Sequence, residues 1–388
     1  MRAPSYSSPR RARNGFKTRA RDSCAAKAPP YTQPVTPSPT RALRILARPA
    51  HTSLKHNPYT SLLYQEVERA GIEVVEYRPH RALLGRWDVL HVHWPESVFD
   101  HTLLEALPTT ESLLFGARRA RRRGSKLLWT IHNLRAHEYR HRTLEERFWR
   151  RFIAELDGVI ALTPAGLAAA RERFSGLDKV PAWLVPHPHY RGQYADTTDR
   201  RAARAALGLP STGKVMLAFG RMYEYKNVPA LLRALRAAPG EPWTVLVAGK
   251  PRSAALEREL REAGGGDSRI RFHLEFIEAG EAQLFFRAAD LVVEPYREIL
   301  NSGTALLALS FDRPVLVPHH GAGVDLARDF GAPWVYTFQG ELSADMLRET
   351  LAAVSSLPER TQGEHVRSID VARVGEHMVR ALRDLAAS

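Results

Sequence analysis

The sequence predicts an α/β protein made of two doubly wound parallel sheets. From residue 41 onward, short aliphatic runs of strand length alternate with helical patterns. Such alternation indicates a parallel sheet that helices cover on both faces. A polar connection near residues 190–210 interrupts the alternation once. The chain has 388 residues, which suits two domains of ordinary size.

The first half begins at the run RILARP and ends at the run AWLVPH. Aliphatic and β-branched residues mark its strands, and Gly71 ends its first helix. The expected strands are 44–49, 72–77, 87–95, 126–133, 158–163 and 182–187, and the expected helices are 57–71, 103–123, 143–155 and 164–174.

The second half restarts at KVMLAFG and shows the same alternation. Its expected strands are 214–220, 243–250, 270–276, 291–296, 314–319 and 334–338. Its expected helices are 227–238, 253–264, 281–289, the apolar run after Thr304, 343–356 and 370–386.

Composition divides the chain further. Residues 1–40 contain eight Lys/Arg and one acid, are rich in Pro, Ser and Ala, and show no periodicity, so we expect a disordered basic arm. A start codon placed too early explains these residues equally well. Residues 41–195 and 205–360 then form two Rossmann-like domains. Residues 361–388 form a C-terminal helix that could pack back on the first domain.

Composition also excludes several classes of protein. Apolar content of 44% and charged content of 25% are those of a soluble globular chain, and no apolar run reaches the ~20 residues of a membrane helix. The N-terminus lacks the apolar core of a signal peptide, so export is not expected. One cysteine, Cys24, excludes an internal disulfide framework and suits a reducing cytoplasm.

A basic cluster closes the otherwise apolar segment LLFGARRARRRG. A solvated helix end explains such a cluster. The alternative is a patch attracted to anionic lipid, where each cation near the surface contributes about 1 kcal/mol. Nucleic acid binding is not expected, because no helix-turn-helix, zinc finger or aromatic RNA-stacking motif accompanies the charge. The cluster consists of Arg118, Arg119, Arg121, Arg122, Arg123 and Lys126.

Four small polar residues connect the strand 291–296 to the apolar helix that follows it. Ser, Asn and Thr satisfy free N–H groups at any helix start, so capping explains them. The alternative is that the phosphates of a ligand bind there, attracted by free N–H groups and the helix dipole. The four residues are Asn301, Ser302, Gly303 and Thr304.

Two cations, Arg221 and Lys226, follow the strand 214–220 at the mouth of a helix. Ordinary loop cations would explain an isolated pair. However, loops after parallel strands open on one edge of the sheet, so this pair and the 301–304 turn are expected together. Together they predict a diphosphate site, in which the cations stabilise a departing nucleoside diphosphate.

The two halves, with the segments FGRMYEYKN and EPYREILNSG, resemble the GT-B glycosyltransferases. In retaining members, Arg and Lys of a G-R-x4-K loop contact the donor diphosphate, and a Glu-x7-Glu element contacts the donor. The resemblance implies these roles for Arg221, Lys226 and Glu294. Ser302 stands where the second Glu of this element would be. The resemblance therefore gives no support to retaining chemistry in this chain.

A closer resemblance is to the GumI-type β-mannosyltransferases of xanthan-like polysaccharide assembly. It covers roughly residues 44–340, through DVLHVHWPE, TIHNLRAHE, PHYRGQY, YKNVPALL and PYREILNSGTALLALSFDRPVLVP. The resemblance implies transfer of mannose from GDP-mannose to a polyprenyl-diphosphate-linked oligosaccharide, with inversion and without a metal. It also implies an acceptor-side first domain and a donor-binding second domain.

Inversion requires a base that deprotonates the acceptor hydroxyl while the diphosphate leaves. We expect this base in the first half, which faces the acceptor. Glu96 is the first candidate, His132 and Glu138 are the others, and His93 stands behind them. Alternation places His91 and His93 on one face of a strand, where core packing explains them equally well.

The resemblance places Asn57 and Tyr59 near acceptor or donor phosphate, although an N-cap role also explains Asn57. His189 is a further cleft candidate, near the expected hinge. The cluster of His187, His189 and Tyr190 invites a metal interpretation, but no acid stands at a suitable spacing.

The leading interpretation is an inverting hexosyltransferase of exopolysaccharide biosynthesis that is cytoplasmic and peripheral on the inner face of the cell membrane. Three alternatives stay open: a GT-B transferase with another nucleotide-sugar donor, a sugar-nucleotide epimerase of the same fold, and a non-catalytic basic membrane scaffold. The scaffold leaves Arg221, Lys226 and the 301–304 turn unexplained.

Overall fold

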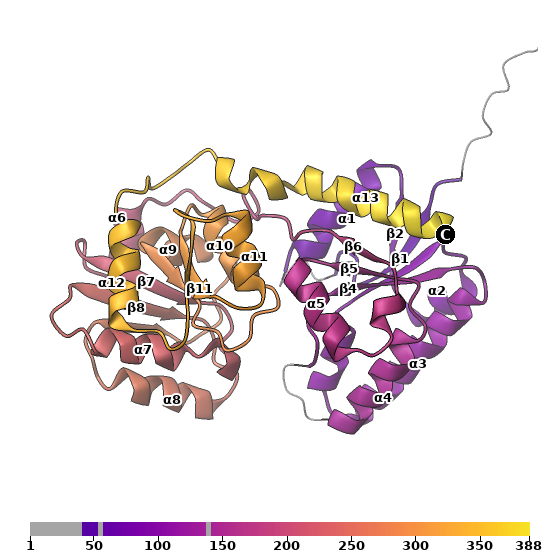
Figure 1. Cartoon of the computed structure of the whole chain (residues 1–388), viewed down its shortest axis with the longest axis horizontal. Helices are drawn as coiled ribbons and strands as arrows, with labels where there is room; N and C mark the ends of the chain where they lie inside the picture. Colours follow the sequence, from indigo (N-terminus) through magenta and orange to yellow (C-terminus); the bar gives the residue numbers. More distant parts are fainter. Residues whose placement is uncertain (1–40, 53–56, 137–140) are drawn as a thin grey trace, which may run out of the picture. The chain divides into compact units, whose positions relative to one another are not determined.

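The computed structural model of the protein describes residues 41–52, 57–136 and 141–388. The compact unit Ala42–Ser388 contains two six-stranded sheets (Figure 1). Every pair of neighbouring strands in both sheets is parallel. The α/β fold class expected from the sequence is therefore confirmed.

The first sheet has the strand order β2-β1-β3-β4-β5-β6. Its central strands are buried along their whole length, because helices cover both faces of a parallel sheet. The strands are β1 (Arg44–Arg48), β2 (Glu73–Glu76), β3 (Val89–His93), β4 (Lys126–Ile131), β5 (Gly158–Ala161) and β6 (Ala182–Leu184). The helices are α1 (Tyr59–Arg69), α2 (Pro79–Leu84), α3 (Leu103–Arg121), α4 (Arg142–Ile153) and α5 (Pro164–Arg173).

The second sheet has the order β12-β11-β10-β7-β8-β9. Its strands are β7 (Lys214–Phe219), β8 (Trp243–Ala248), β9 (Ile270–His273), β10 (Leu291–Val293), β11 (Val315–Pro318) and β12 (Val335–Phe338). Its helices are α6 (Arg200–Ala206), α7 (Val228–Arg236), α8 (Ala254–Gly264), α9 (Ala282–Ala288), α10 (Gly303–Ser310), α11 (Ala322–Asp329) and α12 (Ala344–Ala353), and α13 (Val371–Ala387) ends the chain. The sequence did not predict α2 and α11, which have only six and eight residues and so show little periodicity.

In each sheet the strand order reverses once. The chain adds β2 on one side of β1 and β3 on the other, and it adds β8 on one side of β7 and β10 on the other. In open α/β sheets, ligands bind beyond the carboxyl ends of the strands at this reversal. The loops after β1, β3, β7 and β10 are therefore where a site is expected.

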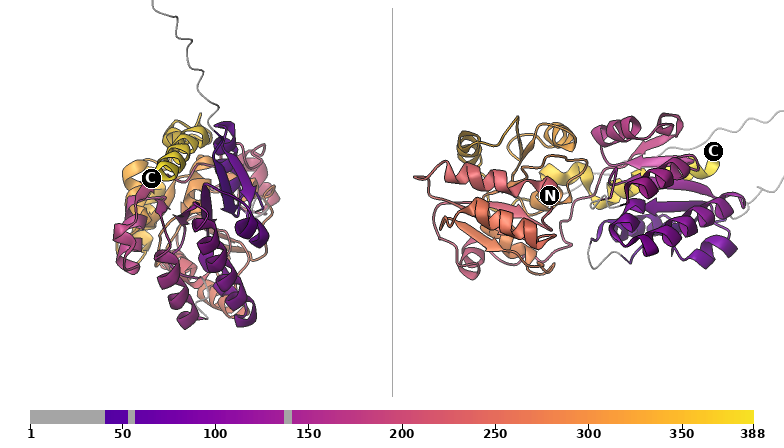
Figure 2. Two further views of the ribbon diagram at one scale, coloured as in Figure 1. Left: turned by 90° about the vertical axis from the view of Figure 1, so that its right-hand side faces the viewer. Right: turned by 90° about the horizontal axis from the view of Figure 1, so that it is seen from below.

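The C-terminal helix α13 packs against α1 (Figure 1), and Figure 2 shows the same ribbon from two further sides. The buried residues Met378 and Leu382 belong to the same core as the first sheet. Gly375 faces α1 so closely that an added Cβ would lie 2.3 Å from the Cβ of Glu66. Glycine at this position therefore allows the close approach of the two helices.

Replacing Gly375 by alanine tests this packing. Alanine is normally the better helix former by about 1 kcal/mol, but the clash with Glu66 should instead lower the free energy of unfolding by roughly 1–3 kcal/mol. Chemical denaturation measures the difference. Gly240→Ala is the matched control, because nothing lies within 4 Å of its added Cβ. A Gly375→Ala variant as stable as wild type would contradict the close packing of α13 on α1.

Candidate active site

Two buried charged residues stand where the strand order of the second sheet reverses. Lys226, in the 3-10 turn after β7, is 6% exposed, and Glu294, directly after β10, is 1% exposed. Lys226 Nζ donates to the carbonyl of Phe219 at 2.9 Å, and Glu294 Oε1 accepts from Ser302 Oγ at 2.7 Å. The structure thus brings three of the predicted donor residues to one place.

Burial is the largest influence on the ionisation of this pair. It lowers the pKa of Lys226 to about 8 and raises the pKa of Glu294 to about 7, while each charge opposes the shift of the other pKa. A bound anion would favour the protonated form of both groups. The charge of the pair therefore responds to a nearby ligand close to neutral pH.

Ser302 connects this pair to helix α10. Its hydroxyl oxygen also accepts from the backbone N–H of Ala305 at 3.1 Å, so it caps the helix. Nearby, a Cβ added to Gly220 would lie 3.1 Å from Lys226 Nζ and 3.6 Å from Thr304 Oγ1. Capping and anion binding, the two explanations of this turn, are therefore compatible, because the capped helix begins beside the lysine.

Asn301 reaches from the second half of the chain to the first. Its amide nitrogen donates to the carbonyl of His132 at 3.0 Å, which fixes the orientation of the amide. Within residues 41–52, 57–136 and 141–388, no donor reaches the buried Asn301 Oδ1. This oxygen can therefore accept a hydrogen bond from a ligand hydroxyl.

A chain of hydrogen bonds leads through the first sheet to His132. Tyr64 Oη contacts His91 Nδ1 and His93 Nε2, each at 2.8 Å, and His93 Nδ1 contacts His132 Nε2 at 3.0 Å. Burial lowers the pKa of all three histidines, so they are neutral at pH 7. Trp94 stacks on His132 with ring centroids 4.1 Å apart. These contacts thus fix the plane of the His132 ring, and burial keeps the ring neutral.

Glu96 lies in the 3-10 segment Pro95–Asp100 and is 2% exposed. Its Oε1 accepts from Asn133 Nδ2 at 2.7 Å, and no donor in the described part of the chain reaches its Oε2. Burial raises the pKa of Glu96 to about 8. A carboxylate with this pKa is a stronger base than an ordinary one, which suits proton abstraction.

The loops after β1 and β6 meet near the start of α10. Asn57 Oδ1 accepts from the backbone N–H of Tyr59 at 3.0 Å and lies 3.4 Å from Tyr190 Oη, which also contacts His187 Nε2 at 3.1 Å. A Cβ added to Gly303 would lie 3.6 Å from Tyr190 Oη. The predicted cleft residues Asn57 and Tyr59 are thus close to the predicted donor turn.

Three other predicted residues are not part of this grouping. Arg221 is exposed, with its guanidinium 5.5 Å from the ring centroid of Tyr223. His189 contacts Asp370, with 2.6 Å between Nε2 and Oδ1, so it faces the segment before α13. Glu138 lies outside the described residues.

A cavity of about 570 Å³ lies beside these groups and is lined by both halves of the chain. The loop after β4 forms one wall, and the loops after β7 and β10 form the other. An ion pair between Arg135 and Glu298, with 2.5 Å between its closest atoms, joins the two walls. Asn133, which donates to Glu96, and Asn301, which donates to the His132 carbonyl, both line the cavity, whereas Glu96 and His132 are not among its lining residues.

The described residues contain neither a cluster of metal ligands nor a helix that could span a membrane. No group of three or more His, Cys, Asp or Glu side chains there is arranged to hold a metal ion. No helix there is both long and apolar enough to cross a bilayer.

Comparison with known proteins identifies the family. A "GDP-mannose:glycolipid 4-beta-D-mannosyltransferase" from Xanthomonas campestris is 30% identical over 325 residues, which cover 82% of this chain and 86% of that protein. The chain belongs to the GumI-type family of GT-B glycosyltransferases. In addition, the family described as "Glycosyl transferases group 1" matches residues 213–347 of this GumI-type chain.

Solved structures agree on the fold of the GumI-type chain. Sucrose-phosphate synthase from Thermosynechococcus elongatus superposes with a TM-score of 0.59 at 17% identity, over 89% of this chain and 96% of that one. Anabaena HepE in complex with UDP and glucose superposes with a TM-score of 0.61 at 15% identity, over 88% of this chain and all of that one. At these identities the likeness establishes the GT-B fold.

Sequence reasoning missed several residues that shape this GumI-type site. Asn133 binds Glu96, although it stands in the segment TIHNLRAHE that carried part of the resemblance. Glu145 Oε1 accepts from the backbone N–H of Ala136 at 2.9 Å, so a second buried carboxylate holds the same loop. Glu145 and Tyr64 lie inside helices, where no motif marks them. Only the contact of Glu145 with Ala136 and the contacts of Tyr64 with His91 and His93 reveal their roles.

The buried carboxyl group of Glu96 predicts a pH-dependent stability. In the unfolded chain it ionises near pH 4.5, whereas in the folded protein it keeps its proton to about pH 8. Because the folded state binds more protons between these values, wild type loses up to about 1.4 kcal/mol of stability per pH unit there. In the Glu96→Gln variant, residue 96 cannot ionise, so the variant does not lose this stability as pH rises.

Thermal unfolding across this pH range measures the effect. The Tm of Glu96→Gln should rise relative to wild type as pH increases from about 5 to about 8. Glu259→Gln, at an exposed carboxylate on α8, is the control. A Tm difference between Glu96→Gln and wild type that stays constant with pH would contradict the burial of Glu96.

Proposed function

We propose that this glycosyltransferase moves mannose from GDP-mannose to a polyprenyl-diphosphate-linked oligosaccharide, with inversion, in exopolysaccharide biosynthesis. The name of the Xanthomonas campestris relative supports a GDP-mannose donor and a glycolipid acceptor. The similarity of the quoted segments to GumI-type enzymes supports the polyprenyl carrier and inversion. A lipid-linked acceptor also supports a peripheral location on the inner face of the cell membrane.

One observation carries the proposal that a sugar binds beside the loop after β4. Three buried polar atoms, Tyr59 Oη, Glu96 Oε2 and Asn301 Oδ1, lack hydrogen-bond partners among the described residues. All three belong to side chains that contact His132 or Asn133. Buried polar atoms without partners are costly, so a ligand with several hydroxyl groups fits this place.

The donor diphosphate would bind between Lys226 and the start of α10. The ammonium group and the free N–H groups of the helix would stabilise the charge that develops as the diphosphate leaves. Arg221 is close in sequence and would need to turn inward to join them. In this arrangement the protein's own cations would stabilise the nucleoside diphosphate as it leaves.

The transfer is a single displacement. The acceptor oxygen attacks C1 of the mannose, the bond from C1 to the diphosphate oxygen breaks, and the hydroxyl proton passes to a base. We propose Glu96 as this base, because its raised pKa suits the task. Asn133 donates to Glu96 Oε1, which would leave Oε2 to accept the proton. His132 is the second candidate, although burial weakens it as a base.

Product analysis tests the proposed reaction. Purified protein is incubated with a polyprenyl-diphosphate-linked oligosaccharide and, in separate reactions, with GDP-mannose, GDP-glucose or UDP-glucose. We expect a β-mannosylated lipid from GDP-mannose alone, identified by mass spectrometry and by NMR of the new linkage. Transfer from UDP-glucose instead would replace the proposed donor. A new free sugar without a lipid product would show an epimerase.

Lys226→Ala should weaken the use of the donor. Loss of one charge-assisted contact costs roughly 1.5–3 kcal/mol, which corresponds to about a 10–150-fold lower kcat/KM for GDP-mannose. Part of the loss should appear in kcat, because the charge of the diphosphate grows as the bond breaks. Lys214→Ala, at the opposite end of β7, is the matched control. Unchanged GDP affinity in Lys226→Ala would place the donor site elsewhere.

Glu96→Gln should separate binding from transfer. We expect GDP to bind as in wild type, while transfer to the acceptor falls by at least about 100-fold. For wild type at saturating GDP-mannose, kcat/KM for the acceptor should increase with pH up to about 8, where Glu96 ionises. Transfer at the normal rate by Glu96→Gln would move the role of base to His132 or Glu138.

A further inference from the structure

Five polar side chains of the first half form a continuous line of hydrogen bonds that ends at His132, and we name it the His132 network. Thr130 Oγ1 contacts His91 Nε2 at 2.8 Å, and His91 Nδ1 contacts Tyr64 Oη at 2.8 Å. Tyr64 Oη also contacts His93 Nε2 at 2.8 Å, and His93 Nδ1 contacts His132 Nε2 at 3.0 Å. The four members behind His132 are each at most 1% exposed, so they can act on a ligand only through His132.

Strand periodicity builds the His132 network. Side chains alternate between the two faces of a sheet, so His91 and His93 of β3 share one face. Thr130 of β4 is the register partner of His93 and lies on that same face, as does His132 just past the end of β4. Helix α1 supplies the buried Tyr64. Because all these groups are removed from water, each hydrogen bond of the network has to be made.

Every member of the His132 network is neutral at pH 7. Burial lowers the pKa of the three histidines and raises the pKa of Tyr64. Each histidine ring therefore has one nitrogen that donates a hydrogen bond and one that accepts. The hydroxyl groups of Tyr64 and Thr130 donate one hydrogen bond each.

These properties leave two arrangements in which every contact of the network has one donor and one acceptor. In the first, the Thr130 hydroxyl donates to His91 and each following group donates to the next, so His132 Nε2 accepts and Nδ1 carries the hydrogen. In the second, every hydrogen bond points the other way, so His132 Nε2 donates and Nδ1 carries no hydrogen. The direction of the network thus sets whether His132 Nδ1 is a donor or an acceptor.

The Thr130 hydroxyl distinguishes the two arrangements. Thr130 is 0% exposed, and His91 Nε2 is the only hydrogen-bond partner of its hydroxyl in the described part of the protein. In the first arrangement the hydroxyl hydrogen is donated to His91. In the second the hydroxyl accepts from His91, and its hydrogen meets no acceptor among the described residues. A buried donor without an acceptor is costly, so the first arrangement should exceed the second by about fivefold or more.

We infer that Thr130 keeps the hydrogen of His132 on Nδ1 and so makes His132 a hydrogen-bond donor to an oxygen atom of the ligand. The other four members of the network are then positioning residues. Within the described residues, the only hydrogen bond of the His132 ring is that of Nε2 with His93, which leaves Nδ1 for the ligand. His132 also stands beside Asn301, whose amide binds the His132 carbonyl. The Nδ1–H group would therefore serve the same ligand as the Asn301 oxygen that lacks a partner.

The direction of the network also bears on the base of the proposed reaction, and this consequence rests on the proposed function. A base needs a free lone pair. In the first arrangement His132 has none, because Nε2 accepts from His93 and Nδ1 carries a hydrogen. Taking up the proton of the attacking hydroxyl would require every hydrogen bond of the network to reverse. That proton would therefore pass to Glu96 Oε2, while His132 stabilises negative charge on the ligand.

Nuclear magnetic resonance of the full chain with 15N-labelled histidine rings tests the position of the hydrogen. A ring nitrogen that carries a hydrogen resonates far from one that does not, so each tautomer has its own pattern. The chain has 16 histidines, and the signals of His132 are those that a His132→Gln variant lacks. We expect ligand-free wild type at pH 7 to show a hydrogen on Nδ1 of His132 and none on Nε2.

Thr130→Val keeps the shape of the side chain and removes the hydroxyl. His91 Nε2 then lacks a partner in both arrangements, so the excess of the Nδ1–H tautomer at His132 should fall by about fivefold or more. Thr130→Ser restores a hydroxyl and should keep the wild-type pattern. Tyr64→Phe interrupts the network between His91 and His93 and should also abolish the excess, which repeats the test if Thr130→Val melts at a lower temperature.

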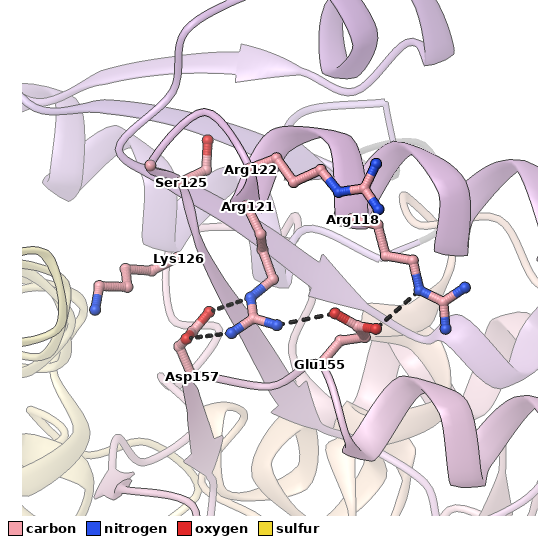
Figure 3. A pocket seen from close by; sticks show the side chains of 8 residues that line it. Arg118, Arg121, Arg122, Ser125, Lys126, Glu155 and Asp157 are labelled. Atoms are coloured by element: carbon pink, nitrogen blue, oxygen red, sulfur yellow. Dashed lines mark hydrogen bonds and ion pairs between the residues drawn. The ribbon is translucent and has the colours of Figure 1, made fainter.

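Ser125→Ala is the matched control, because it removes a buried hydroxyl at the other end of β4. Ser125 directly precedes the strand, is 4% exposed, and donates from its hydroxyl to the carbonyl of Trp87 at 2.7 Å. Figure 3 shows Ser125 at a pocket that also contains the ion pair of Arg121 with Asp157. None of these groups belongs to the network, so the tautomer of His132 should stay as in wild type.

Addition of GDP or GDP-mannose to the labelled protein tests the role of the Nδ1–H group. A shift of its resonance with GDP would assign the bound oxygen to a phosphate, whereas a shift with GDP-mannose alone would assign it to the sugar. Calorimetry on the same samples shows whether each compound binds.

The inference fails on any of three results. One is a hydrogen on Nε2 of His132 in ligand-free wild type. Another is a Thr130→Val variant whose His132 tautomer equals that of wild type. The third is GDP-mannose that binds while the Nδ1–H resonance stays unchanged. Failure of GDP-mannose to bind would instead remove the proposed donor, and the position of the hydrogen, measured without ligand, would stand.

Discussion

The burial of Lys226 and Glu294 close together is the constraint on which the site depends. A buried charge costs several kcal/mol unless a fixed partner compensates for it. Here the ammonium group has the Phe219 carbonyl at the end of β7, and the carboxylate has the Ser302 hydroxyl. Both partners stand at the carboxyl edge where the strand order reverses. The attraction between the two charges, together with the hydrogen bond from the Arg297 N–H to the Tyr225 carbonyl at 2.8 Å, holds the loops after β7 and β10 to each other.

Other features of the site follow from this fixed edge. Ser302 caps α10 and also binds Glu294, so the first turn of α10 is held in place relative to Glu294. The preceding residue, Asn301, then reaches the carbonyl of His132 and connects the second half to the loop after β4. The backbone beside Lys226 is also closely packed. An added Cβ at Gly249 would lie 2.1 Å from the carbonyl oxygen of Gly220. A side chain at Gly249 would push this edge apart.

The sequence predicted the sheets and part of the site for physical reasons. Buried parallel strands appear as aliphatic runs. Loops after such strands share one edge, which is why Lys226 and Ser302 lie near each other, whereas Glu294 was expected there only from the resemblance to GT-B glycosyltransferases. Spacing in the sequence did not predict where the Arg221 side chain points. Arg221 is close to Lys226 along the chain, but its guanidinium lies near the Tyr223 ring. The contact between Asn301 and His132 joins residues 169 positions apart and depends on how the two halves pack. No local pattern encodes such a contact.

In the proposed reaction, the buried, charge-sensitive pair of Lys226 and Glu294 receives the donor diphosphate. Calorimetric titration with GDP in two buffers of different ionisation enthalpy measures the protons exchanged on binding. The negative diphosphate favours the protonated form of both groups, so binding between about pH 7 and pH 8, where the pair titrates, should take up protons. Affinity should therefore fall as pH rises through this range. GDP binding that exchanges no protons there, with a constant affinity, would contradict the account.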